Sequence, residues 1–252
     1  FGLDLPEADL AQALMKLRRQ ESGTDFQRLA LHEIVCISGL WIDEQGSMKI
    51  FSFSREQHSE SEILTKFLSI FDKRNPTLVS WNGSQFDLPV ILFRAMYHGL
   101  SAPSLFDQGE IDQQKRYNNY QNRYHHRHVD LMDIMAMFNG RHFQKLDDVA
   151  HLLGYPGKRG DGAYHVPEYV HQQEWQKLTS YCEADVLNTW LVYLRWLLLK
   201  GQLLLNDYRD LVQQTIQFLS TQAQHADFLA IWRDTSQRTE FTAVDFISFP
   251  TH

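Results

Sequence analysis

The stretch "SWNGSQFDLP", residues 80–89, joins a predicted strand to a predicted helix. Residues 77–81 form a short, mainly apolar run typical of a buried strand, and residues 88–96 repeat apolar side chains at helical spacing. The Asn-Gly pair between them indicates a turn. Ligands of open α/β sheets bind beyond the carboxyl ends of the strands. Asp87, at this junction, is therefore either a ligand-binding acid or only a first-turn acid that stabilises the helix dipole.

The rest of the chain alternates strand and helix patterns before it becomes wholly helical. Two β-branched and aromatic runs joined by a polar turn predict a hairpin, and the following helix is expected to open near Ser59 and to close at Asn75-Pro76. Between residues 101 and 128 the periodicity fails, and a connection of this length is usually functional or mobile. The expected strands are 31–42, 48–53 and 77–81, and a further apolar run is 129–135. The expected helices are 63–71, 88–96 and 146–153, followed by a helix-rich remainder from about residue 174 to 234.

This order of elements predicts an α/β sandwich with a helical tail. We assign residues 1–200 to one α/β domain and residues 201–252 to a helical extension of the same domain. With 252 residues, 43% of them hydrophobic, the chain is long enough to bury a substantial core.

Composition restricts the possible functions. The net charge of −7 argues against a protein that coats nucleic acid by bulk electrostatics, because neutralising phosphates requires clustered Lys and Arg. It does not exclude a nuclease with an acidic metal centre, since bound cations reverse the local charge.

The chain has no apolar run near the roughly 18 residues of a membrane span and no basic leader, so neither a membrane protein nor a secreted one is expected. Cys36 and Cys182 are too few for a disulfide framework or zinc cluster, which favours a reducing cytoplasm.

A second informative stretch is "YCEADVLNTW", residues 181–190, within a predicted helix. Tyr181 and Asp185 are four residues apart and therefore share a helix face, so a phenol and a carboxylate could address one point. The spacing is common by chance, and a surface tyrosine above a helical acid is the alternative.

Several stretches together resemble successive blocks of the predicted 3′-to-5′ exonucleases related to the proofreading domain of family-B DNA polymerases. They are "SGTDFQRLALHEIVCIS" (22–38), "LVSWNGSQFDLPVILFRA" (78–95), "HVDLMDIM" (128–135), "LLGYPGKRGDG" (152–162) and "YCEADVLNTWLVYLR" (181–195). The blocks occur in the family's order over roughly residues 1–200, which makes the resemblance specific.

The resemblance implies a ribonuclease-H-like mixed sheet flanked by helices and the DEDDy type of active site, in which four acids bind two divalent metals. Asp87 matches the acid of the second motif and Asp185 that of the third, while Tyr181 matches the tyrosine that positions the attacking water. The implied cofactors are Mg²⁺ or Mn²⁺, whose preferred ligands are hard oxygens. The first motif, an Asp-x-Glu on the first, central strand, is expected upstream of Phe1.

The resemblance therefore implies a metal-dependent 3′-to-5′ exonuclease that acts on single-stranded DNA, with RNA as the second choice. The alternative is a catalytically inactive module of the same fold that binds single-stranded nucleic acid.

Further residues are candidates for lining the cleft or contacting the substrate. Asp130 lies near a strand end and is a possible cleft acid, whereas local capping is the preferred interpretation of Asp133. Interleaved cations and aromatic rings in residues 115–129 suit a single strand, although a solvated loop fits equally well. The predicted substrate-binding residues are Asn82, Phe86, Lys115, Arg116, Arg123, Arg127 and Lys158; packing remains the favoured role of Phe86, and an ordinary turn that of the segment around Lys158.

Overall fold

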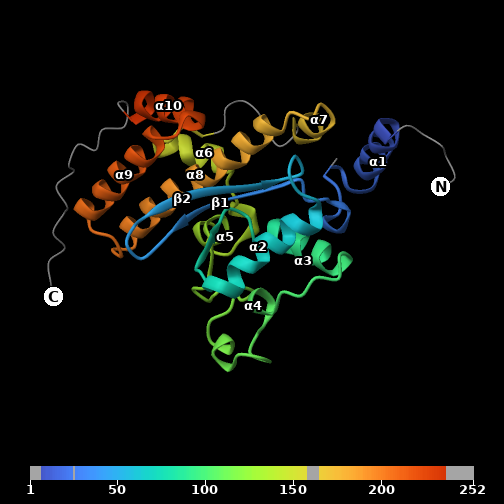
Figure 1. Ribbon diagram of the computed structural model, residues 1–252, viewed down its shortest axis with the longest axis horizontal. Helices are drawn as coiled ribbons and strands as arrows, with labels where there is room; N and C mark the ends of the chain where they lie inside the picture. The colour runs from blue at the N-terminus through green and yellow to red at the C-terminus, as the bar shows by residue number, and fades with distance from the viewer. Residues whose placement is uncertain (1–6, 25, 158–164, 237–252) are drawn as a thin grey trace.

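A computed structural model describes residues 7–24, 26–157 and 165–236 (Figure 1). The strands are β1 (Cys36–Ile42), β2 (Met48–Ser54), β3 (Leu78–Ser80) and β4 (His128–Asp130). The helices are α1 (Glu7–Ser22), α2 (Glu60–Arg74), α3 (Asp87–Tyr97), α4 (Pro103–Phe106), α5 (Leu131–Met135), α6 (Leu146–Leu152), α7 (Val166–His171), α8 (Trp175–Leu199), α9 (Leu205–Ser220) and α10 (Ala226–Ser236). Short 3₁₀ turns lie at η1 (Leu29–Leu31), η2 (Gln113–Arg116), η3 (Gly140–His142) and η5 (Ala223–His225). The predicted α/β class is confirmed, and the described part of the predicted tail, up to residue 236, is mainly helical.

The described strands form two separate sheets of two strands each. β1 and β2 pair antiparallel, with Cys36 opposite Ser54 and Ile42 opposite Met48. β3 and β4 pair in parallel, with Ser80 opposite Asp130. In Figure 1 the β1–β2 hairpin crosses the middle of the molecule, with α8, α9 and α10 on one side and α2, α3 and α4 on the other.

The predicted hairpin is confirmed, but its first strand begins at Cys36 rather than at residue 31. Residues 29–31 form a 3₁₀ turn, and the amide of Ile34 donates to Glu60 Oε1 at 2.8 Å. Since that amide is bound to a side chain, it cannot extend the strand ladder. The chain then reverses around Asp43, whose Oδ1 accepts the amides of Gln45 at 3.0 Å and Ser47 at 2.8 Å.

Helix α2 begins and ends at the signals expected from the sequence. Ser59 and Glu62 form a reciprocal capping box, which satisfies two amides at the helix start. Asn75 ends the helix in the left-handed conformation, with φ of 43°, and Pro76 follows.

Helix α8 connects the two sheets, because it packs against β1, β2 and β3. Buried residues of α8 join α5, α6, α9 and α10 in one hydrophobic cluster; its members include Leu131, Ala150, Leu187, Leu191, Leu219 and Trp232. A second cluster lies between α2, α3 and the connection that follows α3; it includes Ile63, Leu64, Phe71, Ile91, Leu105 and Tyr120. Neither α8 nor any other helix within the described ranges has the length and apolar character needed to cross a membrane.

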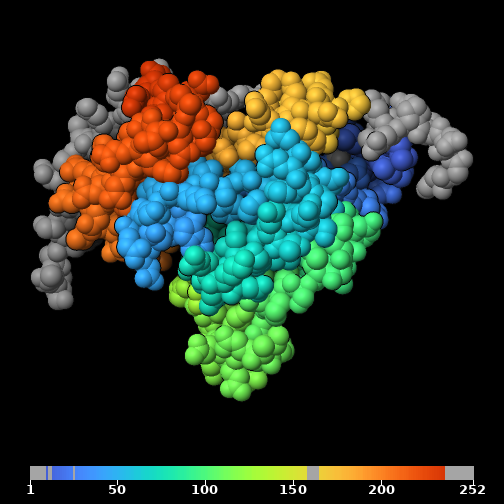
Figure 2. All heavy atoms as spheres, in the orientation of Figure 1, coloured from blue at the N-terminus to red at the C-terminus, as the bar shows by residue number. Residues whose placement is uncertain are grey.

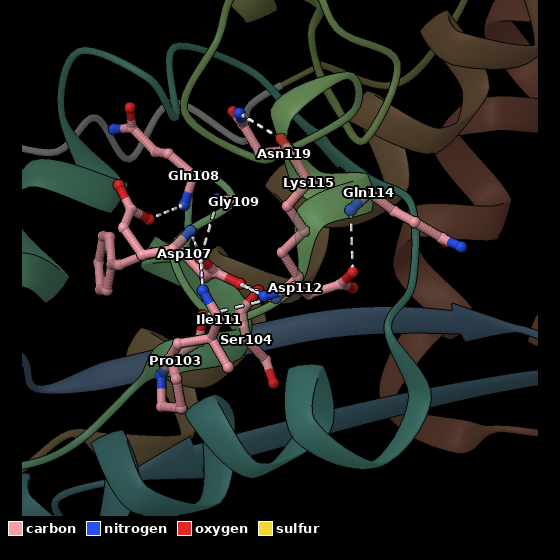
Figure 3. A network of polar contacts seen from close by, with 12 residues as sticks. Pro103, Ser104, Asp107, Gln108, Gly109, Ile111, Asp112, Gln114, Lys115 and Asn119 are labelled. Carbon is pink, nitrogen blue, oxygen red and sulfur yellow. Dashed lines mark hydrogen bonds and ion pairs between the residues drawn. The ribbon is translucent and has the colours of Figure 1, made fainter.

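The connection between residues 101 and 128 is folded upon itself, although its sequence lacks periodicity. Figure 2 shows part of it, in green, projecting from the body of the molecule. Its turn is held by the buried carboxylate of Asp107, which accepts four backbone amides, those of residues 109 to 112, at 2.8 to 3.1 Å (Figure 3). These hydrogen bonds outweigh the effect of burial and hold the pKa of Asp107 well below its usual range.

Glu60, at the start of α2, connects three parts of the fold. Its buried carboxylate accepts Nε of Arg94 at 2.7 Å and the amide of Ile34 at 2.8 Å, and it also contacts Nε2 of His98 at 2.7 Å. Burial raises its pKa, but the hydrogen bonds from these partners outweigh burial and lower the pKa to about 2. The carboxylate therefore stabilises the fold in its charged form.

Glu60→Gln is expected to lower the free energy of unfolding by about 3 kcal/mol at pH 7, because it leaves the largely buried guanidinium of Arg94 without its counter-charge. The folded-state pKa lies below the unfolded value near 4.5, so this stabilisation is present above pH 4.5 and is lost as pH falls toward 2. Urea unfolding of both proteins at several pH values measures the difference, with the exposed Glu56→Gln as control. A difference that does not shrink in acid would contradict this role.

Candidate active site

The turn between β3 and α3 is formed by the "SWNGSQFDLP" stretch, as the sequence predicts. Asn82 adopts φ of 66°, and its carbonyl accepts the amide of Phe86 at 3.0 Å. A Cβ at Gly83 would collide with the hydroxyl of Ser80, so only glycine fits there. Helix α3 then begins at Asp87, directly beyond the carboxyl end of β3, as predicted.

The carboxylate of Asp130 holds this turn from the neighbouring strand. Oδ1 accepts the amide of Asn82 at 2.9 Å, and Oδ2 accepts the amide and hydroxyl of Ser84 at 2.9 and 2.5 Å. Asp130 is buried and is the last residue of β4, which confirms its predicted place at a strand end. Because it binds the turn, it positions the residues leading to Asp87.

Asp87 lies within reach of two further negative charges. Desolvation by the surrounding protein is the main cause that raises the pKa of Asp87, to about 6. The charge of Asp130 and, to a smaller extent, that of Asp185 also raise it, whereas a backbone hydrogen bond lowers it. Its side chain is nevertheless exposed, so water reaches it. A carboxyl group whose pKa is raised by its surroundings and by neighbouring acids is typical of functional sites.

Helix α8 supplies the candidate acid and phenol of the second stretch. Asp185 and Tyr181 are both half-buried and lie one turn apart on the same helix. The effect of Asp185 on the pKa of Asp87 places the two candidate acids, which are 98 positions apart in the sequence, in one electrostatic environment.

The described part of the chain contains no complete metal site of three ligands. No group of three or more His, Cys, Asp or Glu side chains there is arranged to hold a metal ion. The described residues thus provide two exposed or half-exposed carboxylates, Asp87 and Asp185, next to a third, Asp130, that is already engaged in hydrogen bonds.

A buried polar network fixes α8 to the hairpin next to these acids. The hydroxyl of Ser52 donates to Oε1 of Glu183 at 2.6 Å and lies 2.8 Å from the hydroxyl of Ser38. Nε2 of His225 lies 3.4 Å from Oε2 of Glu183, and burial lowers the pKa of this histidine. Since Glu183 lies between Tyr181 and Asp185 in the helix, the network restricts the rotation of α8 and hence the direction of both candidates.

The two cysteines meet at the same interface. Cys36 opens β1 and Cys182 lies in α8, as the sequence predicts, and their neighbouring thiols form no disulfide. This contact, followed by burial and the charges of Asp185 and Asp87, raises the pKa of Cys182 well above its usual value.

The comparison with protein families agrees with this arrangement. The family model of predicted 3′-to-5′ exonucleases related to the exonuclease domain of PolB matches residues 24–235. The chain belongs to this family. No curated protein and no solved structure matches it.

Within this exonuclease-family chain, the residues beside Asp87 have different surroundings. Phe86 packs against the rings of Phe26 and His32, with centroids 5.5 and 5.2 Å apart, which agrees with the packing role favoured for it. Asn82 contributes its backbone to the turn. Whether either residue contacts substrate stays a prediction.

Three of the predicted substrate-binding cations contact the backbone of the connection or of the residue that ends α2. Arg127 precedes β4, and its carbonyl accepts the amide of Leu78, so the connection meets the amino ends of β3 and β4. Asp87 follows the carboxyl end of β3, and Asp130 is the last residue of β4. Lys115 donates to the carbonyl of Ser104 at 2.8 Å and Arg116 to that of Gly109 at 3.4 Å, so both support the connection itself.

The remaining predictions have mixed outcomes. Asp133 lies in the first turn of α5, but its buried carboxylate binds the guanidinium of Arg123, with Nε at 3.0 Å from Oδ2, so it makes a long-range ion pair rather than a local cap. Lys158 lies outside the described residues. The substrate contacts predicted for Arg123 and Lys158 stay predictions.

Two positioning residues were missed by the sequence interpretation. Ser84 binds Asp130 through its amide and hydroxyl, and Glu183 binds Ser52. An acid amid the apolar residues of α8 was a usable signal for Glu183, because buried carboxylates require partners. Ser84 gave no signal beyond its place in a turn.

Asp87→Asn is expected to stabilise the metal-free protein by about 1 kcal/mol at pH 7.5, a value reduced for the solvent that screens this exposed side chain. The folded-state pKa of about 6 exceeds the ordinary value of 3.8, so the wild-type protein loses stability as pH rises from 4 to 6. Urea unfolding in EDTA at pH 4 and 7.5 measures this, with the exposed Asp72→Asn as control. An equal effect at both pH values would show that the charge of Asp87 is not responsible.

Proposed function

We propose that the protein is a divalent-metal-dependent 3′-to-5′ exonuclease that removes nucleotides from single-stranded DNA. The observation that carries the proposal is the shared electrostatic environment of Asp87 and Asp185 at the carboxyl end of β3. Membership of the predicted exonuclease family supports it.

Asp87 and Asp185 are the residues that would hold Mg²⁺ or Mn²⁺. Carboxylate oxygens are the hard ligands these cations prefer, and a cation relieves the repulsion that raises the pKa of Asp87. When bound, a metal pair stabilises the attacking and leaving oxygens of an in-line displacement.

Tyr181 would orient the attacking water through its hydroxyl. A phenol has an ordinary pKa near 10, so at neutral pH it positions the water by hydrogen bonding rather than acting as the base. Asp130 acts indirectly, since its oxygens hold the turn that leads to Asp87.

The proposed fold is ribonuclease-H-like, with a further central strand that carries the Asp-x-Glu of the first motif. The two described sheets support this proposal, because β1 and β3 belong to different sheets and yet pack under the same helix, α8. A strand between them would unite the sheets and bring two more acids toward Asp87 and Asp185.

A second candidate function is a non-catalytic module that binds single-stranded nucleic acid. It is favoured by one observation, the absence of a group of three metal-binding side chains from the described residues. Binding that is unaffected by Mn²⁺, without any degradation, would support it.

Asp185→Asn is expected to lower the rate of degradation by on the order of 10³-fold, because a metal ligand contributes several kcal/mol to transition-state stabilisation. The measurement uses the protein extended at its amino end by the preceding encoded residues, Mn²⁺, and a 5′-labelled 20-nucleotide oligodeoxythymidylate whose shortening is followed on a gel. EDTA should abolish the ladder, and the exposed Asp72→Asn should leave it unchanged. Full activity of Asp185→Asn would reject the site.

Tyr181→Phe should lower kcat by about 10²-fold with little change in KM, because the lost hydroxyl orients water and not the substrate. Single-turnover rates and KM on the same oligonucleotide separate these effects. A rise in KM at constant kcat would instead assign Tyr181 to substrate binding.

A further inference from the structure

A cavity of about 420 Å³ lies at the far end of α8 from the candidate acids. We name it the back pocket. It is lined by Thr77, Arg123, Tyr124, His125, His126, Val129, Ile134, Phe138, Tyr193, Trp196, Leu197, Lys200 and Gln202. Its volume lies within the range of small-molecule sites.

The back pocket combines aromatic rings with groups that carry or can gain positive charge. Tyr124, Phe138, Tyr193 and Trp196 provide four rings, and Nζ of Lys200 lies 5.8 Å from the ring centroid of Trp196. None of the described residues that line it is acidic, although the chain has a net charge of −7. This lining favours an anionic ligand that has flat rings.

One wall of the back pocket is held in a strained conformation. Met137 and Phe138 both have positive φ, 52° and 61°, which side chains other than glycine rarely adopt. The guanidinium of Arg123, paired with Asp133, lies 5.0 Å from the ring centroid of Phe138, and the ring of Tyr124 meets that ring edge-on at 5.0 Å. Strain that the surroundings maintain is a feature of binding sites.

The back pocket is separate from the candidate active site. Trp196 follows Asp185 by 11 residues, which corresponds to roughly 16 Å along the axis of α8. Thr77, at the amino end of β3, also lines the pocket, whereas Asp87 follows the carboxyl end of that strand. A ligand in the pocket would therefore be remote from the reacting phosphate.

We propose that the back pocket is a second binding site for single-stranded nucleic acid, in which an unpaired base stacks on Tyr124 and Trp196 while Lys200 contacts a phosphate. The inference rests on the proposed function only in taking nucleic acid as the substrate. Single strands fit this lining because their bases are free to stack, whereas those of a duplex are stacked on one another. The site holds the strand while its 3′ end is processed elsewhere.

The test measures binding in EDTA, where no degradation occurs. Fluorescence anisotropy gives Kd for labelled 20-nucleotide oligodeoxythymidylate and oligouridylate. Tyr124→Ala should weaken binding about tenfold, as loss of one stacked base does. Lys200→Glu should also weaken it and should reduce the slope of log Kd against log salt by about 0.7, the value for one single-strand phosphate.

Two matched controls separate the pocket from general surface effects. Tyr97→Ala removes an exposed ring from α3, outside both the back pocket and the 115–129 segment, and Lys66→Glu reverses an exposed charge on α2. Both should leave Kd unchanged. Tyr124 is 68% exposed and Lys200 is exposed, so their substitutions should not unfold the protein, which circular dichroism verifies.

The outcomes distinguish this inference from the proposed function. Weaker binding by Tyr124→Ala and Lys200→Glu supports the back pocket even if the extended protein degrades no oligonucleotide. Unchanged Kd in both variants overturns it even if Asp185→Asn abolishes degradation. Equal weakening by Tyr97→Ala, or no binding of either oligonucleotide to the wild type, also overturns it. Preference for one oligonucleotide identifies DNA or RNA as the ligand.

Discussion

The candidate site depends on the hydrogen bonds that Asp130 accepts from the turn after β3. One buried carboxylate at the end of β4 binds two amides and one hydroxyl of that turn, so the pairing of β3 with β4 and the start of α3 are set together. Hydrogen bonds from amides to a charged carboxylate are stronger than those between neutral groups. The direction in which Asp87 leaves the sheet is therefore determined by a residue 43 positions later in the chain.

Helix α8 positions the second candidate acid, Asp185, in the way that the turn after β3 positions Asp87. It is fixed along its length by different contacts: Glu183 binds Ser52 of the hairpin, and Asn188 exchanges hydrogen bonds with the backbone of Gly157 at 3.0 and 3.1 Å. A helix held at several points can neither slide nor rotate freely. The orientation of α8, and with it the direction of Asp185, is thus set by buried polar groups that need partners elsewhere, because their burial without partners would be costly.

Membership of a predicted exonuclease family and the raised pKa of Asp87 both indicate that the neighbouring acids are functional. Neighbouring acids destabilise a protein without cations, and they persist where function requires them. The candidate acid Asp87 follows the carboxyl end of β3, while the rings and cations of the back pocket gather around the last turns of α8 and the amino end of β3. Helix α8 contributes to both ends, with Asp185 in its first half and Trp196 near its last turn.

The sequence by itself determined the local elements and the candidate acids. Local patterns depend on residues close together in the sequence, so they can be predicted from the sequence alone. They are the apolar run of β3, the turn after it, the capping signals of α2 and the helical spacing of Tyr181 and Asp185. Only the tertiary structure decided which side chains meet. It showed Asp133 bound to Arg123, Glu183 bound to the hairpin, and part of the basic aromatic connection lining a pocket with the last turns of α8. These outcomes depend on ion pairs and hydrogen bonds between residues distant in sequence, and local patterns contain no information about such partners.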